Sequence, residues 1–246
     1  MSALDIQSLS RSFGGVSALS NVSFTVEPGE RRLIIGPNGA GKTTLFNLLS
    51  GIFAPSAGRL SLFDQDVTAL AMHERARLGL ARTFQITQLF PRLSVLDNVL
   101  LALQTGHRGA WSPLRSMRSQ HALYERAQQL LAQWQLDPIA GQQARAISYG
   151  EQRQVDLMLA MANTPRVLLL DEPMAGLSAA EVVRVSGMIR SLPRSTTILL
   201  NEHDMDVAFD LADQITVLHQ GRKIAEGDGP AIRADAQVNE IYLGVD

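Results

Sequence analysis

The 246-residue chain contains no cysteine, only two lysines and few aromatic side chains. Without cysteine it has no disulfide bonds, no zinc sites built on thiolates and no cysteine nucleophile. No apolar run approaches the roughly 18 residues that a membrane-spanning helix needs. The segment Met1–Gln7 has neither the basic start nor the apolar stretch of a secretory signal, so none is expected. We therefore expect a soluble protein that reaches a membrane only through a partner.

Excess charge is also missing. The 22 basic and 24 acidic side chains leave a net charge of −2 and a pI of about 6.2. Binding of nucleic acid through bulk charge needs a more basic chain, so no nucleic-acid partner is expected. Hydrophobic residues make up 46% of the sequence, which is enough for a sizeable core and excludes a disordered or fibrous chain.

Short apolar runs alternate with helix-length amphipathic segments, a pattern typical of βα units around a largely parallel sheet. Strands are predicted over Leu4–Leu9, Val22–Val26, Arg32–Ile35, Arg59–Phe63, Ala81–Phe84, Val167–Leu170, Thr197–Leu200, Gln214–His219 and Arg222–Ala225. Helices are predicted over Lys42–Ser50, His73–Leu78, Val95–Leu103, Ser119–Trp134, Glu151–Ala162, Ala179–Arg190 and Asp204–Leu211, with a short final helix within 235–246. Glycine-containing turns, rather than helices, separate the first strands, which predicts an antiparallel β patch beside the parallel sheet.

Residues 94–161 show helical periodicity and no convincing strand, although strands are predicted on both sides. We therefore predict one domain over 1–246. Its α/β core comprises 1–85 and 162–246, and 86–161 form an inserted helical subdomain.

A glycine-rich loop follows the apolar run Leu33–Ile35 and precedes a predicted helix. Its residues fit the pattern G-x-x-x-x-G-K-[ST] and are Gly36, Pro37, Asn38, Gly39, Ala40, Gly41, Lys42 and Thr43. Glycines let successive backbone N–H groups turn inward around phosphate oxygens at a helix N-terminus. Lys42, one of the two lysines, supplies a point charge for the β- and γ-phosphates, and Thr43 offers its hydroxyl to Mg²⁺. The alternative is an ordinary turn before a helix, but average composition yields the pattern in a chain of this length only about once per hundred sequences.

Two acids close the apolar run Val167–Leu170, which is typical of a strand buried on both faces. Ligands bind beyond the carboxyl ends of such strands, so Asp171 is placed to hold Mg²⁺. Glu172 is the candidate general base for a water that attacks the γ-phosphate. Alone, such a pair is more often a helix cap or a surface turn; the lysine-containing loop upstream favours the catalytic interpretation.

Ser148 and Glu151 form an S-x-x-E capping box at the start of a predicted helix. The surrounding segment, Ile147–Gln152, also resembles the signature motif of ATP-binding-cassette (ABC) ATPases. Phe13 resembles the adenine-stacking aromatic of that family, and Gln85 resembles the glutamine of its Q-loop. Met174–Ser178 resembles the D-loop, and His203 resembles the switch histidine. The resemblance covers essentially the whole chain, with the motifs in the family's order.

This resemblance implies a P-loop NTPase fold and hydrolysis of ATP with Mg²⁺. The implied catalytic residues are Lys42, Gln85, Glu172 and His203, and the implied metal ligands are Thr43, Gln85 and Asp171. The implied nucleotide contacts are Phe13, the loop Gly36–Thr43, Thr44, Ser148, Gly150 and Glu151. In the family, the phosphate loop of one subunit and the signature of a second sandwich each ATP, so a dimer is implied.

The chain departs from the family pattern at three positions. Tyr149 stands where the signature has a glycine, Glu151 stands where it has glutamine, and Ser178 replaces the D-loop aspartate. The last change puts in doubt the signal that this aspartate carries across the dimer.

Within the family, the chain is similar to ATPase subunits of branched-chain amino-acid importers. The features that carry this similarity are Ser148–Gly150, Glu202–Met205, the insertion Gly106–Met117 with Trp111, and Ile241–Gly244. Such a subunit implies integral-membrane permease partners and a place on the cytoplasmic face of the cell membrane. A lipopolysaccharide-export ATPase, which shares the final Tyr-Leu-Gly, and a soluble non-transport ABC ATPase are the alternatives. A nucleotide switch without turnover is disfavoured by Glu172. The cargo, and the choice between a homodimer and a heterodimer, stay open.

Other charged residues are given structural roles. Arg75, Arg77 and Arg82 are expected on a solvated helix face and the segment after it. The histidines other than His203 lack metal-ligand spacing and are assigned structural roles.

Overall fold

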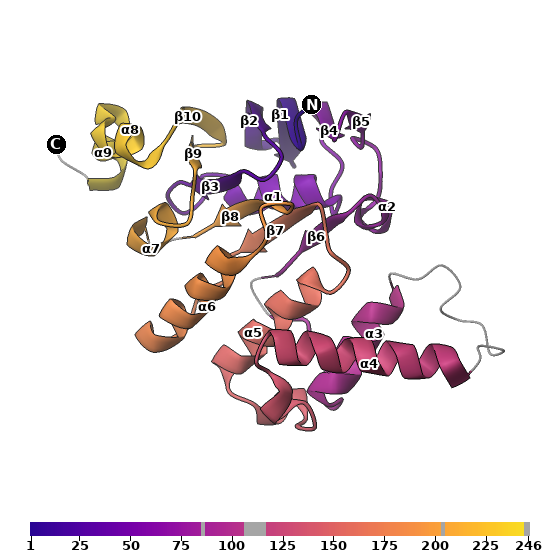
Figure 1. Cartoon of the computed structure of the whole chain (residues 1–246). Helices are drawn as coiled ribbons and strands as arrows, with labels where there is room; N and C mark the ends of the chain where they lie inside the picture. The colour runs from indigo at the N-terminus through magenta and orange to yellow at the C-terminus, as the bar shows by residue number, and fades with distance from the viewer. Residues whose placement is uncertain (85–86, 106–116, 203–204, 244–246) are drawn as a thin grey trace.

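The computed structural model describes residues 1–84, 87–105, 117–202 and 205–243. Two sheets and a separate group of helices make up this part of the chain (Figure 1). The six-stranded sheet has the order β10-β9-β3-β8-β7-β6. Its strands are β3 (Arg31–Ile35), β6 (Leu80–Arg82), β7 (Val167–Asp171), β8 (Thr197–Asn201), β9 (Gln214–His219) and β10 (Arg222–Gly227). All neighbours pair in parallel except β10, which is antiparallel to β9.

The second sheet is antiparallel and has the order β2-β1-β4-β5. It consists of β1 (Leu4–Phe13), β2 (Val16–Val26), β4 (Ala57–Leu62) and β5 (Gln65–Asp66). Gly14 and Gly15 join β1 to β2 and both have positive φ, of 52° and 89°. A two-residue hairpin of this kind needs φ > 0 at both positions, which explains the glycine pair. The predicted antiparallel patch is confirmed.

Helix α1 (Lys42–Ser50) lies between the two sheets, and its apolar side chains join one core with the inner face of the antiparallel sheet. Alternate residues of β7 point to opposite faces: Val167 and Leu169 join this core, whereas Leu168 and Leu170 join a second core under α6 (Ala179–Ser191). Both faces of β7 are therefore buried, which accounts for its continuous apolar sequence.

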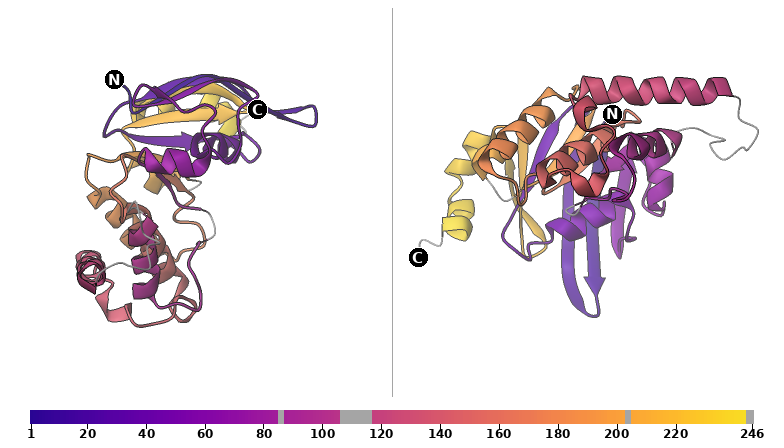
Figure 2. Two further views of the ribbon diagram at one scale, coloured as in Figure 1. Left: turned by 90° about the vertical axis from the view of Figure 1, so that its right-hand side faces the viewer. Right: turned by 90° about the horizontal axis from the view of Figure 1, so that it is seen from below.

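The inserted helices are α3 (Val95–Thr105), α4 (Met117–Gln133) and α5 (Tyr149–Met161), with short 3₁₀ turns at Asp137–Ile139 and Ala144–Ala146. They share an apolar cluster of their own, drawn from residues 89–162. Figure 1 and the left-hand view of Figure 2 show these helices at the end of the molecule opposite the antiparallel sheet. The domain boundaries at 85/86 and 161/162 stay a prediction, which this clustering supports.

The remaining helices are α2 (Met72–Arg77), α7 (Met205–Phe209), α8 (Gly229–Ala234) and α9 (Ala236–Leu243). The fold class, an α/β P-loop fold with mixed and antiparallel sheets and inserted helices, is confirmed. Strand β5, helix α8 and the 3₁₀ turns were not predicted; segments of two or three residues in particular carry too little periodicity.

The expectation for the three arginines is wrong at two positions. Arg77 is exposed, but the Arg75 residue is only 1% exposed and its guanidinium donates to the carbonyls of Leu48 and Leu49. These carbonyls lie in the last turn of α1, where intrahelical N–H donors run out, so the buried arginine supplies donors there. The Leu48 carbonyl also accepts from the N–H of Gly51 at 3.2 Å. Burial lowers the pKa of Arg75 to about 10. The side chain of Arg82 is buried as well, and its partners belong to the functional site.

Candidate functional site

The topology brings several predicted site residues to one edge of the mixed sheet. Strands β3, β6, β7 and β8 are parallel, so their carboxyl ends meet at that edge. The phosphate loop follows β3, Asp171 ends β7, Asn201 ends β8 and Arg82 ends β6. The sequence prediction that the loop and the acid pair lie at strand ends is thus realised in the sheet.

The glycines of the loop are required by their surroundings. Gly36 has φ of 155°, and a Cβ there would overlap the carbonyl oxygen of Leu218. Gly41, the N-cap of α1, has φ of 101°. The N–H of Gly221, in the turn between β9 and β10, donates to the carbonyl of Ala40 at 3.0 Å. The loop is therefore shaped by the β9–β10 hairpin, a contact that the sequence pattern does not reveal.

The N-terminus of α1 carries no side-chain cap, and no acidic residue lies in its first turn. Lys42, the first residue of the helix, is 6% exposed, and its ammonium donates to the carbonyls of Gly36 and Pro37. Burial lowers the pKa of Lys42, while the nearby charges of Glu172 and Asp171 act in the opposite direction. The loop thus combines uncapped helix N–H groups with a buried cation, the arrangement that binds phosphate.

Asp171 is held from two sides. Its Oδ2 accepts a hydrogen bond from Arg82 Nη2 at 2.7 Å, and its Oδ1 accepts one from Asn201 Nδ2 at 2.8 Å. Side-chain exposure of the Arg82–Asp171 pair is 5% and 7%. The sequence analysis identified the carboxylate but missed both partners, since neither belongs to a recognised motif.

The backbone of Glu172 adopts a left-handed conformation, with φ of 49°. Its N–H donates to the carbonyl of Asn201 at 2.9 Å, and its own carbonyl accepts from Ala175 at 3.1 Å. A non-glycine residue at positive φ costs of order 1 kcal/mol or more, and such residues cluster at functional sites. The turn therefore orients Glu172 at the end of β7 at the expense of local strain.

The signature segment begins α5, and a capping box already lies at its N-terminus. Ser148 accepts from the N–H of Glu151 at 3.2 Å, and the Glu151 carboxylate accepts from the N–H and hydroxyl of Ser148, which makes the predicted capping box. The carboxylate of Glu181, in the first turn of α6, lies against Gly150. A Cβ at Gly150 would overlap that carboxylate. Two carboxylates therefore lie at the start of α5.

Glu181 is a residue that the sequence analysis did not assign to the site. Its carboxylate also accepts from the hydroxyl and the N–H of Ser178, at 2.6 and 2.8 Å. These hydrogen bonds lower the pKa of Glu181. The capping box at Ser178 was the available signal, but the contact between α6 and α5 has no counterpart in the local sequence.

Phe13 lies at the end of β1 and its residue is 38% exposed, as a platform for an aromatic base requires. The Arg11 guanidinium lies 4.7 Å from the centroid of the Phe13 ring, and the ring of Phe53 packs edge-on against it at 5.5 Å. The stacking role of Phe13 stays a prediction.

Gln85 and His203 lie outside the described residues, so their predicted roles stay predictions. The residues beside them are placed. Arg153 of α5 donates to the carbonyl of Phe84 at 2.8 Å, and Glu202 accepts from the N–H of Met174 at 2.8 Å. Asp156 of α5 accepts from the backbone N–H of Gln88, and burial raises its pKa to about 6. Helix α5 therefore contacts the chain on both sides of Gln85.

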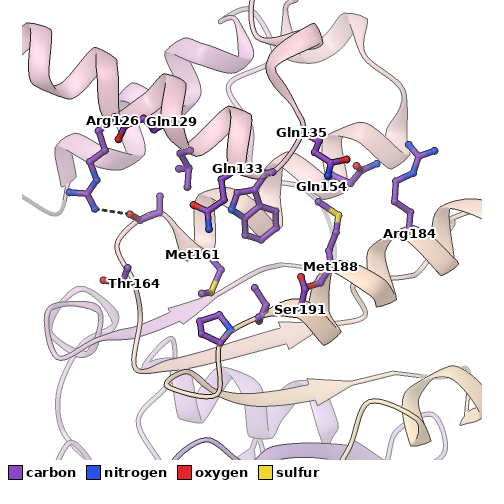
Figure 3. Close-up of a pocket in the computed structure, with 15 residues that line it drawn as sticks. Arg126, Gln129, Gln133, Gln135, Gln154, Met161, Thr164, Arg184, Met188 and Ser191 are labelled. Carbon is purple, nitrogen blue, oxygen red and sulfur yellow. Dashed lines mark hydrogen bonds between the residues drawn. The ribbon is translucent and has the colours of Figure 1, made fainter.

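A cavity of about 760 Å³ lies among α4, α5 and α6, away from the predicted site residues (Figure 3). Its lining includes Arg126, Gln129, Met161, Arg184 and Met188. None of the predicted catalytic, nucleotide or metal residues lines this cavity. The phosphate loop, and not this cavity, is therefore the candidate site.

Two further searches cover only the described part of the chain. In it, no helix is both long and apolar enough to span a bilayer. No group of three or more His, Cys, Asp or Glu side chains is arranged to hold a metal ion there.

The comparisons with known proteins agree with this geometry. The family model described as "ABC transporter" matches residues 19–175. The chain is similar to the high-affinity branched-chain amino acid transport ATP-binding protein LivG of Escherichia coli K12, with 38% identity over 98% of this chain and 97% of that protein. It is also similar to the lipopolysaccharide export system ATP-binding protein LptB of Acidithiobacillus ferridurans, with 36% identity over 98% of this chain and 96% of that protein.

Solved structures show the same likeness. The ADP conformation of an ATP-binding cassette of an ABC transporter matches with a TM-score of 0.86 and 29% identity, over 100% of both chains. A dimeric ATP-binding cassette in a post-hydrolysis state, bound to ADP and Pi, matches with a TM-score of 0.77 and 25% identity, over 92% of this chain and 98% of that chain.

Proposed function

The chain belongs to the ABC transporter family, and from this premise we propose that it is the ATP-hydrolysing subunit of an importer for branched-chain amino acids or similar small polar solutes. Its similarity to LivG over nearly the full length of both chains supports this substrate class. The similarity to LptB supports the alternative of lipopolysaccharide export. The importer remains our choice because Glu202–Met205 and the insertion at 106–117 resemble the importer subunits.

The uncapped N-terminus of α1, with Lys42 folded onto its own loop, carries the proposal. We expect the ammonium to exchange the carbonyls of Gly36 and Pro37 for the β- and γ-phosphate oxygens of ATP. The N–H groups of Gly39 to Thr43 then surround these oxygens, and Thr44 lies in the same first turn. Phe13 is proposed to stack on the adenine.

The donor set at this edge suits Mg²⁺. Thr43 and Asp171 offer a hydroxyl and a carboxylate, and Gln85 is the third proposed ligand. Mg²⁺ prefers oxygen and is commonly held by one or two protein groups together with substrate phosphates and waters, so a cluster of acids is not needed. The carbonyl oxygen of the Asn201 side chain is buried beside Asp171 without a hydrogen-bond partner in the described structure, which leaves an oxygen acceptor at this edge. When bound, the ion neutralises charge on the phosphate oxygens.

The chain's own residues are proposed to carry the proton and charge chemistry. Glu172 accepts the proton of the attacking water, and its strained backbone at the end of β7 fixes its direction. Lys42 stabilises negative charge on the transferred phosphoryl group, and His203 contacts the γ-phosphate. Each of these roles is a proposal for this chain.

A second cassette subunit completes the site. The start of α5, with Ser148, Gly150 and Glu151, is proposed to meet the γ-phosphate that the partner's phosphate loop holds. Loss of that phosphate on hydrolysis then weakens the dimer. Permease subunits receive the movement, which places the protein at the cytoplasmic face of the membrane.

The test is transport by the assembled system. Cells that lack the chromosomal copy are supplied with the wild-type chain or with Glu172→Gln, and uptake of labelled leucine is measured. We expect uptake with the wild type and none with the variant. Absence of leucine uptake, together with rescue of a strain deficient in lipopolysaccharide export, would assign the chain to the alternative.

A further inference from the structure

One buried arginine joins three elements around the site. The guanidinium of Arg82, at the end of β6, donates from Nη2 to Asp171 on β7 at 2.7 Å. Its Nη1 donates to Asn47 Oδ1 and Ser50 Oγ, both at 2.8 Å, on α1. Helix α1 is the helix that begins at Lys42. One planar group therefore spans the strand of the acid and the helix of the phosphate loop.

The contacts also fix the orientation of the carboxylate. Arg82 holds Oδ2 of Asp171 and Asn201 holds Oδ1, so rotation about the last side-chain bond breaks at least one hydrogen bond. A carboxylate has about four acceptor directions, and these two partners leave others open. A guanidinium presents its donors in a rigid fork, which a flexible ammonium does not reproduce. Partners of this kind orient metal ligands in other proteins.

We propose that Arg82 is a positioning residue, which orients Asp171 toward the Mg²⁺ of Mg–ATP and fixes it relative to α1. This inference rests on the proposed function, in which Asp171 is a ligand of that ion. The inference gives Arg82 a role beyond stabilising the fold. An ion pair that only stabilises the fold is not expected to change how much Mg²⁺ strengthens ATP binding.

Arg75 provides a matched control. It is also a buried arginine that holds α1, but its partners in the structure are backbone carbonyls, including those of Leu48 and Leu49. No hydrogen bond joins it to Asp171 among the described contacts. Loss of either arginine is therefore expected to destabilise the fold, whereas only Arg82 is expected to affect the metal.

The experiment measures ATP affinity by calorimetry with excess Mg²⁺ and again with EDTA, for the full chain and for Arg82→Gln, Arg82→Lys and Arg75→Gln. The ratio of the ATP affinity with Mg²⁺ to the ATP affinity in EDTA reports how much the metal strengthens ATP binding. We expect this ratio to fall about tenfold in Arg82→Gln, while affinity in EDTA changes less than threefold. Arg82→Lys retains the positive charge, and its ratio is expected to fall about threefold. Arg75→Gln is expected to unfold at a lower temperature with the wild-type ratio.

A wild-type ratio in the Arg82 variants would overturn the inference, and so would an equal loss in Arg75→Gln. If Arg82→Gln does not fold, the ratio in Arg82→Lys decides the question in the same way. A wild-type chain whose ATP affinity does not change with Mg²⁺ would instead overturn the proposed metal site itself. The failure of the inference and the failure of the proposed function thus give different results.

Discussion

Helices α1 and α5 are both proposed to bind ATP phosphates through their N-termini, yet the two ends differ. Helix α1 begins at Lys42, after the N-cap residue Gly41, with no side-chain cap and no acid in its first turn. Helix α5 begins with the Ser148–Glu151 capping box, and the Glu181 carboxylate lies against Gly150. The N-terminus of α1 has no carboxylate beside it, whereas two carboxylates lie at the N-terminus of α5.

This difference suggests an order of events. An anion at α1 meets unoccupied N–H groups and a cation, so a single chain is expected to bind nucleotide. An anion at α5 must compete with hydrogen bonds that the chain makes to itself. The gain from closing the dimer is therefore smaller than the full strength of the α5 contacts, which favours a dimer that forms and separates with each ATP.

The largest expected effect comes from Glu172→Gln, which leaves both helix ends intact and removes the base. Hydrolysis is expected to fall about a thousandfold, in line with losses of 10²–10⁴ for a general base. ATP binding is kept, so the variant is expected to accumulate as an ATP-bound dimer. Phosphate release and light scattering measure the two effects, and substantial turnover in the variant would falsify the role of Glu172.

Gly150→Ala breaks the α5 end alone. The added methyl group overlaps the Glu181 carboxylate, so that carboxylate must turn away or the start of α5 must move. In the Glu172→Gln background we expect ATP-dependent pairing to weaken about a hundredfold, a loss of about 3 kcal/mol. ATP binding by the single chain is expected to stay within threefold.

Gly187→Ala is the control for this change. Gly187 lies within α6, and a Cβ there meets nothing within 4 Å. It is expected to raise helix stability by about 1 kcal/mol and to leave pairing unchanged. Equal pairing by the Gly150 and Gly187 variants would contradict the role given to the α5 end.

Asp156→Asn tests the surroundings of the middle of α5 through the pH dependence of the protein's stability. Burial raises the pKa of Asp156 to about 6, above the value of about 4 expected in the unfolded chain. The native state therefore holds the proton more tightly, and the wild type loses stability relative to the variant as pH rises from about 4 to about 7. Above that range the variant is expected to be more stable by about 3 kcal/mol, since the pKa differs by about two units and each unit is worth about 1.4 kcal/mol.

Urea unfolding at pH 4, 5, 6, 7 and 8 measures this difference. The asparagine oxygen still accepts the N–H of Gln88, so the comparison isolates the charge. A difference in stability that does not change with pH would show that Asp156 is not held in the way described.

Glu181→Gln is expected to have the smallest effect on dimer formation. It makes the N-terminus of α5 more like that of α1, because one fewer carboxylate lies beside it. It removes one negative charge beside the N–H of Gly150 while retaining an acceptor for Ser178. ATP-dependent pairing is expected to strengthen about threefold, because a charge near a helix end is worth about 0.3–1 kcal/mol. Analytical ultracentrifugation measures the dimer constant, and weaker pairing than in the wild type would count against competition at α5.

The surroundings of the α1 N-terminus could be predicted from the sequence better than those of the α5 N-terminus. The loop at Gly36–Thr43 and the acids Asp171 and Glu172 are contiguous motifs with a strand or helix on each side, so their chemistry and placement were predictable. The strands of the mixed sheet were predictable because both faces are buried. The partners of these motifs were not, since Arg82, Asn201, Gly221 and Glu181 reach them only through tertiary contacts. Arg82 was misassigned for the same reason: local polarity indicated solvent, whereas Asp171, 89 residues away, provides its partner.

The central claim is that Lys42 and its loop bind the triphosphate, and the chain's two lysines allow a direct test. Calorimetric titration with Mg–ATP compares the wild type with Lys42→Ala and Lys223→Ala; Lys223 pairs with Glu226 on β10. We expect Lys42→Ala to lose about a hundredfold in affinity, or about 3 kcal/mol, and Lys223→Ala to bind as the wild type does. Wild-type affinity in Lys42→Ala, or an equal loss in both variants, would contradict the account.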